Sequence, residues 1–202
     1  MNQETQKSID QSIALINKNP ALCVWPYASV SVRINLRSKA EIYKTCCCNL
    51  DPDLFVPTTD EDPFAEIKQL QLQGQWPAAC HQCQQEENNG GVSERTRFFI
   101  GLPLERLVNF IDHPKVDHFQ LNFKSGNLCN LACRSCNAND SSTFAKLTNH
   151  KVDLQIATDI SENPLYWNAI KKSILENVDK HDNFFVHPIG GETLIQPGMH
   201  KI

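Results

Sequence analysis

Apolar residues recur along this chain with two periods, that of a helix and that of a strand. The helical period appears first, near the start of the chain. Three isoleucines near the start share one helix face: Ile9, Ile13 and Ile16. They predict an amphipathic helix over residues 1–18, which ends before Pro20. The segments 63–74 and 95–113 have similar spacing and are also predicted to be helical, with their apolar faces packed in a core.

The strand period appears next, around positions 30–43. Apolar and polar side chains alternate from Val30 to Leu36, which is typical of a half-buried strand. Residues 37–40 are predicted to turn, and a short return through Ile42 and Tyr43 completes a hairpin. Because antiparallel pairing brings the ends of a hairpin together, Cys23 before it and Cys46–Cys48 after it are expected to lie close together.

The second half of the chain alternates strands with helices. Residues 118–123 are predicted to form a strand, and helical patterns follow at 142–148 and 164–178. The apolar run at 184–186 predicts a second strand, buried on both faces. The order strand, helix, strand favours a parallel crossover unit of an α/β fold.

Composition narrows the class of protein. The 202 residues are 41% hydrophobic and 21% charged, which is typical of a globular protein. The chain has no long apolar run for a membrane span, and its net charge of -4 without a Lys/Arg cluster argues against a nucleic-acid-binding surface. Its polar start lacks a secretory pattern, so we expect a cytoplasmic protein. In a reducing compartment, nine cysteines favour metal binding over disulfides.

The densest chemistry follows the predicted strand at 118–123, where Cys129, Cys133 and Cys136 share one loop. Three thiolates can bind three irons of a cubane cluster and leave the fourth iron open for chemistry. A zinc site needs a fourth ligand at short range, and the pair Cys80 and Cys83 lies far outside the usual separation of zinc knuckles. Structural zinc is therefore the minority interpretation.

This cysteine spacing after a strand resembles the cluster motif of the radical S-adenosylmethionine (SAM) superfamily. Gly190, Gly191 and Glu192 directly follow the second predicted strand, where that superfamily carries a Gly-Gly-Glu motif. The resemblance implies a 4Fe-4S cluster on the three cysteines, and contact of the Gly-Gly-Glu segment with the amino group of SAM. Glycines suit this role because a backbone without side chains can approach a ligand closely.

The other cysteines resemble the auxiliary-cluster region called Twitch or SPASM, here placed before the barrel. Cys23 with Trp25–Tyr27, followed by the hairpin and Cys46, resembles one half of that region. The segment from Gly74 to Arg95, which contains a second cysteine pair, resembles the other half.

This second resemblance implies an auxiliary 4Fe-4S cluster held by four thiolates. The best ligand set is Cys23, Cys46, Cys80 and Cys83. Cys47 is an alternative to Cys46. Cys48 is expected to be an ordinary buried thiol.

The resemblance implies an α/β fold that begins a (β/α)6 radical SAM barrel, preceded by a small α+β cysteine-rich domain. The expected domains are an auxiliary region at 1–95, a linker helix at 96–117 and the start of the radical SAM core at 118–202. Only two barrel strands are predicted before Ile202. We therefore expect a truncated chain, a split gene product, or a chain that needs a partner to supply the rest of the barrel.

The implied activity is reductive cleavage of SAM to a 5′-deoxyadenosyl radical, which then abstracts hydrogen from a substrate. The resemblance also implies an electron donor such as flavodoxin or ferredoxin, and it suggests peptides as the substrate class. The sequence indicates no catalytic side chain. Two other classes stay open: an iron-sulfur binding protein that is catalytically incomplete, and a structural zinc protein.

Overall fold

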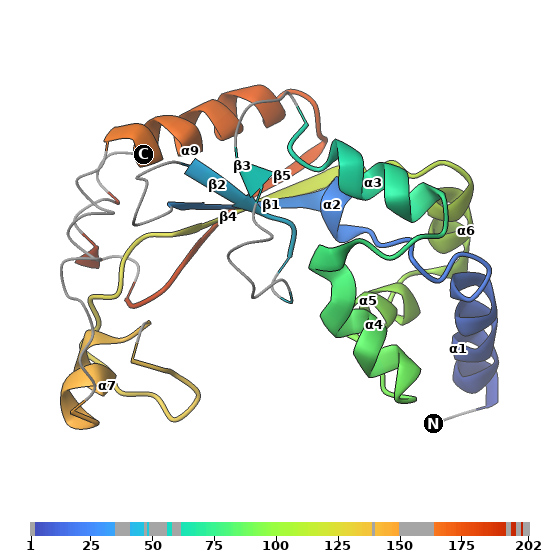
Figure 1. Cartoon of the computed structure of the whole chain (residues 1–202), viewed down its shortest axis with the longest axis horizontal. Helices are drawn as coiled ribbons and strands as arrows, with labels where there is room; N and C mark the ends of the chain where they lie inside the picture. Colours follow the sequence, from blue (N-terminus) through green and yellow to red (C-terminus); the bar gives the residue numbers. More distant parts are fainter. Residues whose placement is uncertain are drawn as a thin grey trace. The chain divides into compact units, whose positions relative to one another are not determined.

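A computed structural model describes residues 3–34, 41–46, 48, 56–57, 62–138, 140–149, 164–192, 195–196 and 199. The chain divides into two compact units, whose elements are labelled in Figure 1. Unit 1 comprises Met1–Val30 and Lys44–Phe119, and unit 2 comprises Ser31–Tyr43 and Gln120–Ile202. The turn expected at 37–40 lies outside the described residues.

Unit 1 is mainly helical. Its helices are α1 (Gln3–Ile16), α2 (Trp25–Ala28), α3 (Ala65–Leu72), the 3-10 helix η2 (Ala78–Cys80), α4 (His81–Asn88), α5 (Glu94–Ile100) and α6 (Leu104–Asp112). The helices predicted near the start and at 63–74 are confirmed as α1 and α3. The region 95–113 contains two helices, which Gly101–Pro103 separates. No helix in the described residues is both long enough and apolar enough to cross a membrane.

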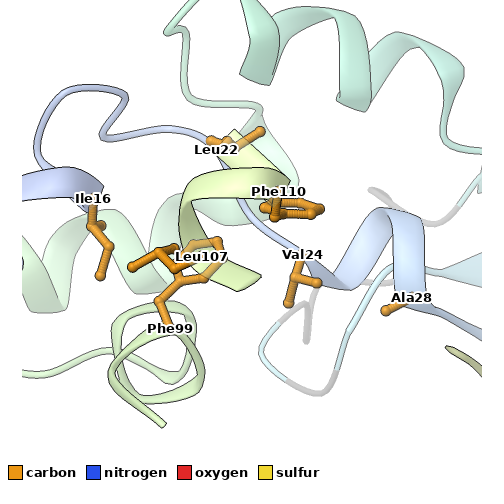
Figure 2. Close-up of a cluster of buried hydrophobic side chains, with 7 residues drawn as sticks. All are labelled: Ile16, Leu22, Val24, Ala28, Phe99, Leu107 and Phe110. Carbon is orange, nitrogen blue, oxygen red and sulfur yellow. The ribbon is translucent and has the colours of Figure 1, made fainter. Parts of the chain in front are cut away.

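The hydrophobic core of unit 1 forms where α5 and α6 pack against α1 (Figure 2). Its buried side chains are Ile16, Leu22, Val24, Ala28, Phe99, Leu107 and Phe110. Leu107 is 0% and Phe99 1% exposed, and burying a side chain of this size contributes roughly 1.5–3 kcal/mol. Both helices of the region expected as a linker therefore belong to a packed core.

The strands form an open mixed sheet in the order β3-β2-β1-β4-β5. They are β1 (Ser29–Ile34), β2 (Glu41–Lys44), β3 (Val56–Pro57), β4 (His118–Lys124) and β5 (Asn183–Ile189). The predicted hairpin strands are confirmed as the sheet neighbours β1 and β2. The described residues have a mixed α/β fold and show no barrel.

The predicted strand-helix-strand unit consists of β4, α7 (Ser142–Leu147), α9 (Pro164–Asn177) and β5. The N–H of Ser125, just after β4, donates to the carbonyl of Ile189 at the end of β5 (3.0 Å). The two strands therefore run in the same direction and end at the same edge of the sheet. The prediction that 184–186 is buried on both faces is wrong, because Phe185 is 56% and Val186 42% exposed. Among the strands that the structure describes, β5 is the last in the sheet order and has a neighbour on one side only.

Helix α9 fixes the end of β4 through two aromatic residues. Trp167 packs edge-on against Phe123, with ring centroids 5.9 Å apart. The buried hydroxyl of Tyr166 accepts from the N–H of Lys124 and donates to its carbonyl, both at 2.9 Å. The last residue of β4 is thus held just before the loop that carries three cysteines.

A buried ion pair joins α4 to α5 in unit 1. Arg95 is 1% exposed, and its guanidinium contacts both carboxylate oxygens of Glu87, with Nε 2.9 Å from Oε1. Its third nitrogen donates to the carbonyl of Leu22 (3.0 Å), and the guanidinium lies 5.3 Å from the centre of the Trp76 ring. Because a buried charge is costly without partners, this complete set of contacts is what allows Arg95 to be buried.

Acid is expected to destabilise unit 1 through this ion pair. Partial burial raises the pKa of Glu87, but hydrogen bonds from Arg95, Ser93 and Thr96 and the charge of Arg95 hold it below its usual value of 4.5. A carboxyl whose pKa is lower in the folded than in the unfolded state stabilises the fold above the unfolded pKa. That contribution is lost as the pH falls below 4.5 and through the folded pKa, so the urea midpoint of unfolding should fall there.

Two variants make this measurement specific. Glu87→Gln should be less stable than the wild type at pH 7, and the difference should shrink as the pH falls, because the lost carboxylate no longer titrates. Glu105→Gln, at an exposed position of α6, should keep the wild-type pH profile. Equal pH profiles for the wild type and Glu87→Gln would contradict the assignment.

Candidate metal centres

Four cysteines that are far apart in the sequence belong to unit 1: Cys23, Cys46, Cys80 and Cys83. Cys23 is 7% and Cys83 8% exposed, and the other two are half-buried. Among the described cysteines, Cys23, Cys80 and Cys83 of unit 1 and Cys129, Cys133 and Cys136 of unit 2 are free thiols. Cys47, the alternative to Cys46, lies outside the described residues. The full predicted ligand set therefore belongs to one unit.

These thiols influence one another's ionisation. Burial raises the pKa of the Cys23 thiol, the N–H of Trp25 lowers it, and the Cys80 and Cys46 thiols raise it further. Burial likewise raises the pKa of Cys80 to about 12, and the thiols of Cys46 and Cys83 act in the same direction. These effects link Cys23 with Cys80 and Cys46, and Cys80 with Cys46 and Cys83. A metal bound here would release protons from the thiols.

Gln71 connects two of these cysteines and is 0% exposed. Its side-chain oxygen accepts from the N–H of Cys23 (3.3 Å), and its amide nitrogen donates to Sγ of Cys80 (3.7 Å). An N–H donated to sulfur favours the thiolate, which is the form that binds metal. Gln71 therefore holds the backbone of one candidate ligand and the sulfur of another.

The buried Arg95 holds the same cysteine-bearing segments. It bonds to the carbonyl of Leu22, the residue before Cys23, and to Glu87 of α4, the helix that contains Cys83. Its charge also acts to lower the pKa of Cys23, although burial dominates. The ion pair thus positions the thiols as well as stabilising the helices.

The four thiols match the ligand requirement of a cluster without forming a finished metal cage. Four thiolates are the ligands of a saturated 4Fe-4S cluster. Among the residues that the structure describes, no three Cys, His, Asp or Glu side chains are grouped as they would be around a bound metal ion. The ligand chemistry fits a cluster, and the side chains would have to turn toward it for all four to bind.

The second cysteine group lies in unit 2, directly after β4. Cys133 is exposed, and Cys129 and Cys136 are half-buried. Sγ of Cys129 accepts from the N–H of Leu131 (3.4 Å), and the N–H of Cys136 donates to the carbonyl of Cys133 (3.0 Å). The loop therefore folds on itself at the carboxyl ends of β4 and β5, which is where open α/β sheets bind ligands.

Hydroxyl groups at the start of α7 anchor this loop. The hydroxyl of Ser141 caps the helix and also donates to the carbonyl of Leu131 (2.8 Å). The hydroxyl of Ser142 accepts from the N–H of Cys129 (3.1 Å), and that of Thr143 donates to the carbonyl of Cys129. These bonds fix the backbone at Cys129 and leave its sulfur available.

The Gly190–Glu192 segment is hydrogen-bonded to the cysteine loop and its flanks. The N–H of Gly191 donates to the carbonyl of Asp140, and that of Glu192 donates to the carbonyl of Leu128, each at 2.8 Å. Gln196, which is 1% exposed, donates to the carbonyls of Leu128 and Glu192 and accepts from the N–H of Leu128. The structure thus brings together the two segments that the sequence suggests for SAM.

This close approach explains two of the glycines. Gly191 has φ +59°, and a Cβ there would lie 2.3 Å from the carbonyl oxygen of Leu128. Gly190 has φ +88°, and its Cβ would lie 2.6 Å from the carbonyl oxygen of Gly126. Residues with a side chain rarely adopt such backbone angles, and a Cβ could not fit in such gaps. The glycines therefore allow contact between two parts of the chain, in addition to any contact with a ligand.

No protein-family model, curated protein or solved structure matches this chain. The interpretation of both centres accordingly depends on their own residues and contacts. Sequence patterns do not single out the residues that anchor the cysteines, although Gln71 and the segment Ser141–Thr143 show a weak signal in the sequence. Gln71 lies on the buried face of α3, one turn after Ile67, and Ser141–Thr143 form the hydroxyl-rich start typical of a helix. Gln196 leaves none.

Replacing Gln71 by leucine should lower the free energy of unfolding by about 1–3 kcal/mol, because the N–H of Cys23 loses its acceptor in a buried site. Anaerobic urea denaturation measures this change. The control is Gln69→Leu, at an exposed position on the same helix, which should stay within about 0.5 kcal/mol of the wild type. Similar losses in both variants would mean that the amide of Gln71 does not hold the site.

Gly191→Ala should disrupt the contact between the two loops of unit 2. The matched control is Gly90→Ala, which has a similar φ of +76° but open space around its Cβ, so it isolates the cost of the backbone angle, about 1 kcal/mol. Gly191→Ala adds a clash with Leu128. We expect faster hydrogen exchange at the amide of Glu192 in this variant only, measured by mass spectrometry. Unchanged protection of that amide would contradict the contact.

Proposed function

We propose that this chain is an iron-sulfur protein of the radical SAM class, which cleaves S-adenosylmethionine reductively. The observation that carries the proposal is the hydrogen-bonded contact between the flanks of the cysteine loop (129–136) and the Gly190–Glu192 segment. Both lie at the carboxyl ends of β4 and β5. A three-thiol loop and a glycine-rich turn at that position are what a cluster with an open iron and its amino-acid-like ligand would need.

Each part of this site has a distinct role in the proposal. Cys129, Cys133 and Cys136 hold the cluster, and the half-buried carboxylate of Glu192 accepts a hydrogen bond from the amino group of SAM. This assignment is consistent with the hydrogen bonding, because the N–H groups of Gly191 and Glu192 already donate within the chain. The bound cluster supplies the electron that splits SAM into methionine and a 5′-deoxyadenosyl radical.

The cysteines of unit 1 hold an auxiliary 4Fe-4S cluster in this proposal, with Cys23, Cys46, Cys80 and Cys83 as ligands. Their place in one unit, and the hydrogen bonds of Gln71 to both Cys23 and Cys80, support a shared site. A cluster saturated by four thiolates suits electron relay, with flavodoxin or ferredoxin as the source of electrons. The region would then be of the Twitch/SPASM type.

The finer fold is part of the same proposal. Strands β4 and β5 would be the first two strands of a (β/α)6 barrel, and the radical would abstract hydrogen from a substrate, for which a peptide is the class that the resemblance suggests. Fold and function are separable, so the site chemistry has to be tested directly.

Anaerobic reconstitution with iron and sulfide tests the cluster assignment. The wild type should hold about eight irons per chain, as two 4Fe-4S clusters, and absorb broadly near 400 nm. Changing Cys129, Cys133 and Cys136 together to alanine should remove about half of this iron, and Cys80→Ala with Cys83→Ala should remove the other half. Cys48→Ala is the matched cysteine control and should leave the iron content unchanged.

Chromatography of 5′-deoxyadenosine after dithionite reduction tests the chemistry, with Cys133→Ala as the control. Product from the wild type and none from Cys133→Ala supports a radical SAM enzyme. Two clusters without product, both from this chain alone and with a chain that supplies the rest of the barrel, would leave an iron-sulfur binding protein and exclude the cleavage. Bound zinc with no absorbance near 400 nm would refute the proposal in favour of a structural zinc protein.

A further inference from the structure

Unit 1 contains a cavity of about 440 Å³, and no cysteine lines it. Its volume falls in the range of small-molecule sites, about 300–1,000 Å³. The apolar side of the cavity is built on the hydrophobic core, because Val24 and Phe110 belong to both (Figure 2). Phe98 and Leu102 extend this side. A ligand that enters therefore meets a packed apolar surface.

The cavity lining also includes polar and positively charged side chains. Arg106 and Asn109 lie on α6, at helical spacing from Leu102, and Lys115 comes from the segment before β4. Among the lining residues, Arg106 and Lys115 outnumber the one carboxylate, Asp117, which lies 3.4 Å from Nδ1 of His118. Neither Arg106 nor Lys115 forms a salt bridge within 4.0 Å to a described carboxylate.

We infer that this cavity binds a small aromatic carboxylate, with its ring on the apolar side between Phe98 and Leu102 and its carboxylate on Arg106 and Lys115. Aromatic rings gain from offset or edge contacts with Phe98, and guanidinium groups bind carboxylates through two parallel hydrogen bonds. Asn109 adds an amide for a further polar group. Pockets of this kind, apolar with a few convergent polar groups, are the usual small-molecule sites of proteins.

The site is separate from the proposed cleavage of SAM and requires no cluster. It does lie next to one, because Val24 lines the cavity and directly follows Cys23. An occupant would thus sit one residue from a candidate ligand of the auxiliary cluster.

Calorimetric titration of the whole chain with naphthalene-2-carboxylate tests the inference. The neutral 2-naphthylmethanol and the ringless acetate ion serve as matched probes. We expect saturable binding of one naphthalene-2-carboxylate per chain, at least about tenfold weaker binding of 2-naphthylmethanol, and no detectable binding of acetate, since both the ring and the charge are needed.

Variants place the binding in the cavity. Arg106→Gln should weaken binding of naphthalene-2-carboxylate about tenfold, whereas Arg97→Gln, an exposed arginine of α5 outside the cavity, should not change it. Leu102→Trp should occupy the space beside Phe98 that the ring needs and so weaken binding strongly, with circular dichroism as the check on folding. Because Arg106 is exposed, its variant keeps the test valid even if Leu102→Trp fails to fold. Absent binding, equal affinity for the neutral probe, or equal effects of the two arginine variants would each overturn the inference.

Discussion

The buried ion pair between Arg95 and Glu87 is the interaction on which unit 1 depends. A guanidinium that is 1% exposed is stable only when its hydrogen-bonding groups and charge are matched, and here one carboxylate, one backbone carbonyl and one indole ring do so. These partners come from three segments of the chain. The energetic requirement to satisfy one buried charge therefore also fixes where Cys23 and Cys83 lie, since each is adjacent to a partner or shares its helix.

Periodicity predicts the elements well where burial is one-sided. Helix α1, helix α3 and the strands β1 and β4 follow their apolar patterns, because each packs one face on a core. The pattern fails for α4, in which every side chain except Cys83 is polar, and for β5, whose apolar run lies at the sheet edge. Contacts between distant residues hold these two elements in place, and a local pattern does not record such contacts.

The same distinction applies to the candidate centres: the sequence indicates the ligands and does not indicate the residues that position them. Thiols are conspicuous in a sequence because their chemistry and spacing restrict what they can do, so the candidate ligands can be named in advance. The residues that position them cannot, because a buried glutamine is defined by its partners. Gln71 bonds across a separation of 48 residues and Gln196 across 68, so only the folded chain reveals them. Gly190 and Gly191 are intermediate between the two groups. The sequence indicates that a close approach occurs at these glycines, but it does not indicate which segment approaches them.

The two cysteine groups differ in exposure in a way that matches different chemistry. In unit 2 the loop is held by its backbone, through the hydroxyls of α7 and the Gly190–Glu192 segment, and this leaves Cys133 exposed. In unit 1 Cys23 and Cys83 are buried, and burial is the largest influence on the pKa of Cys23 and of Cys80. A metal that reacts with a ligand needs an open side, whereas a metal saturated by its ligands is protected by burial. Under the proposed function, anchoring the backbone would serve the first need, and covering Cys23 and Cys83 would serve the second.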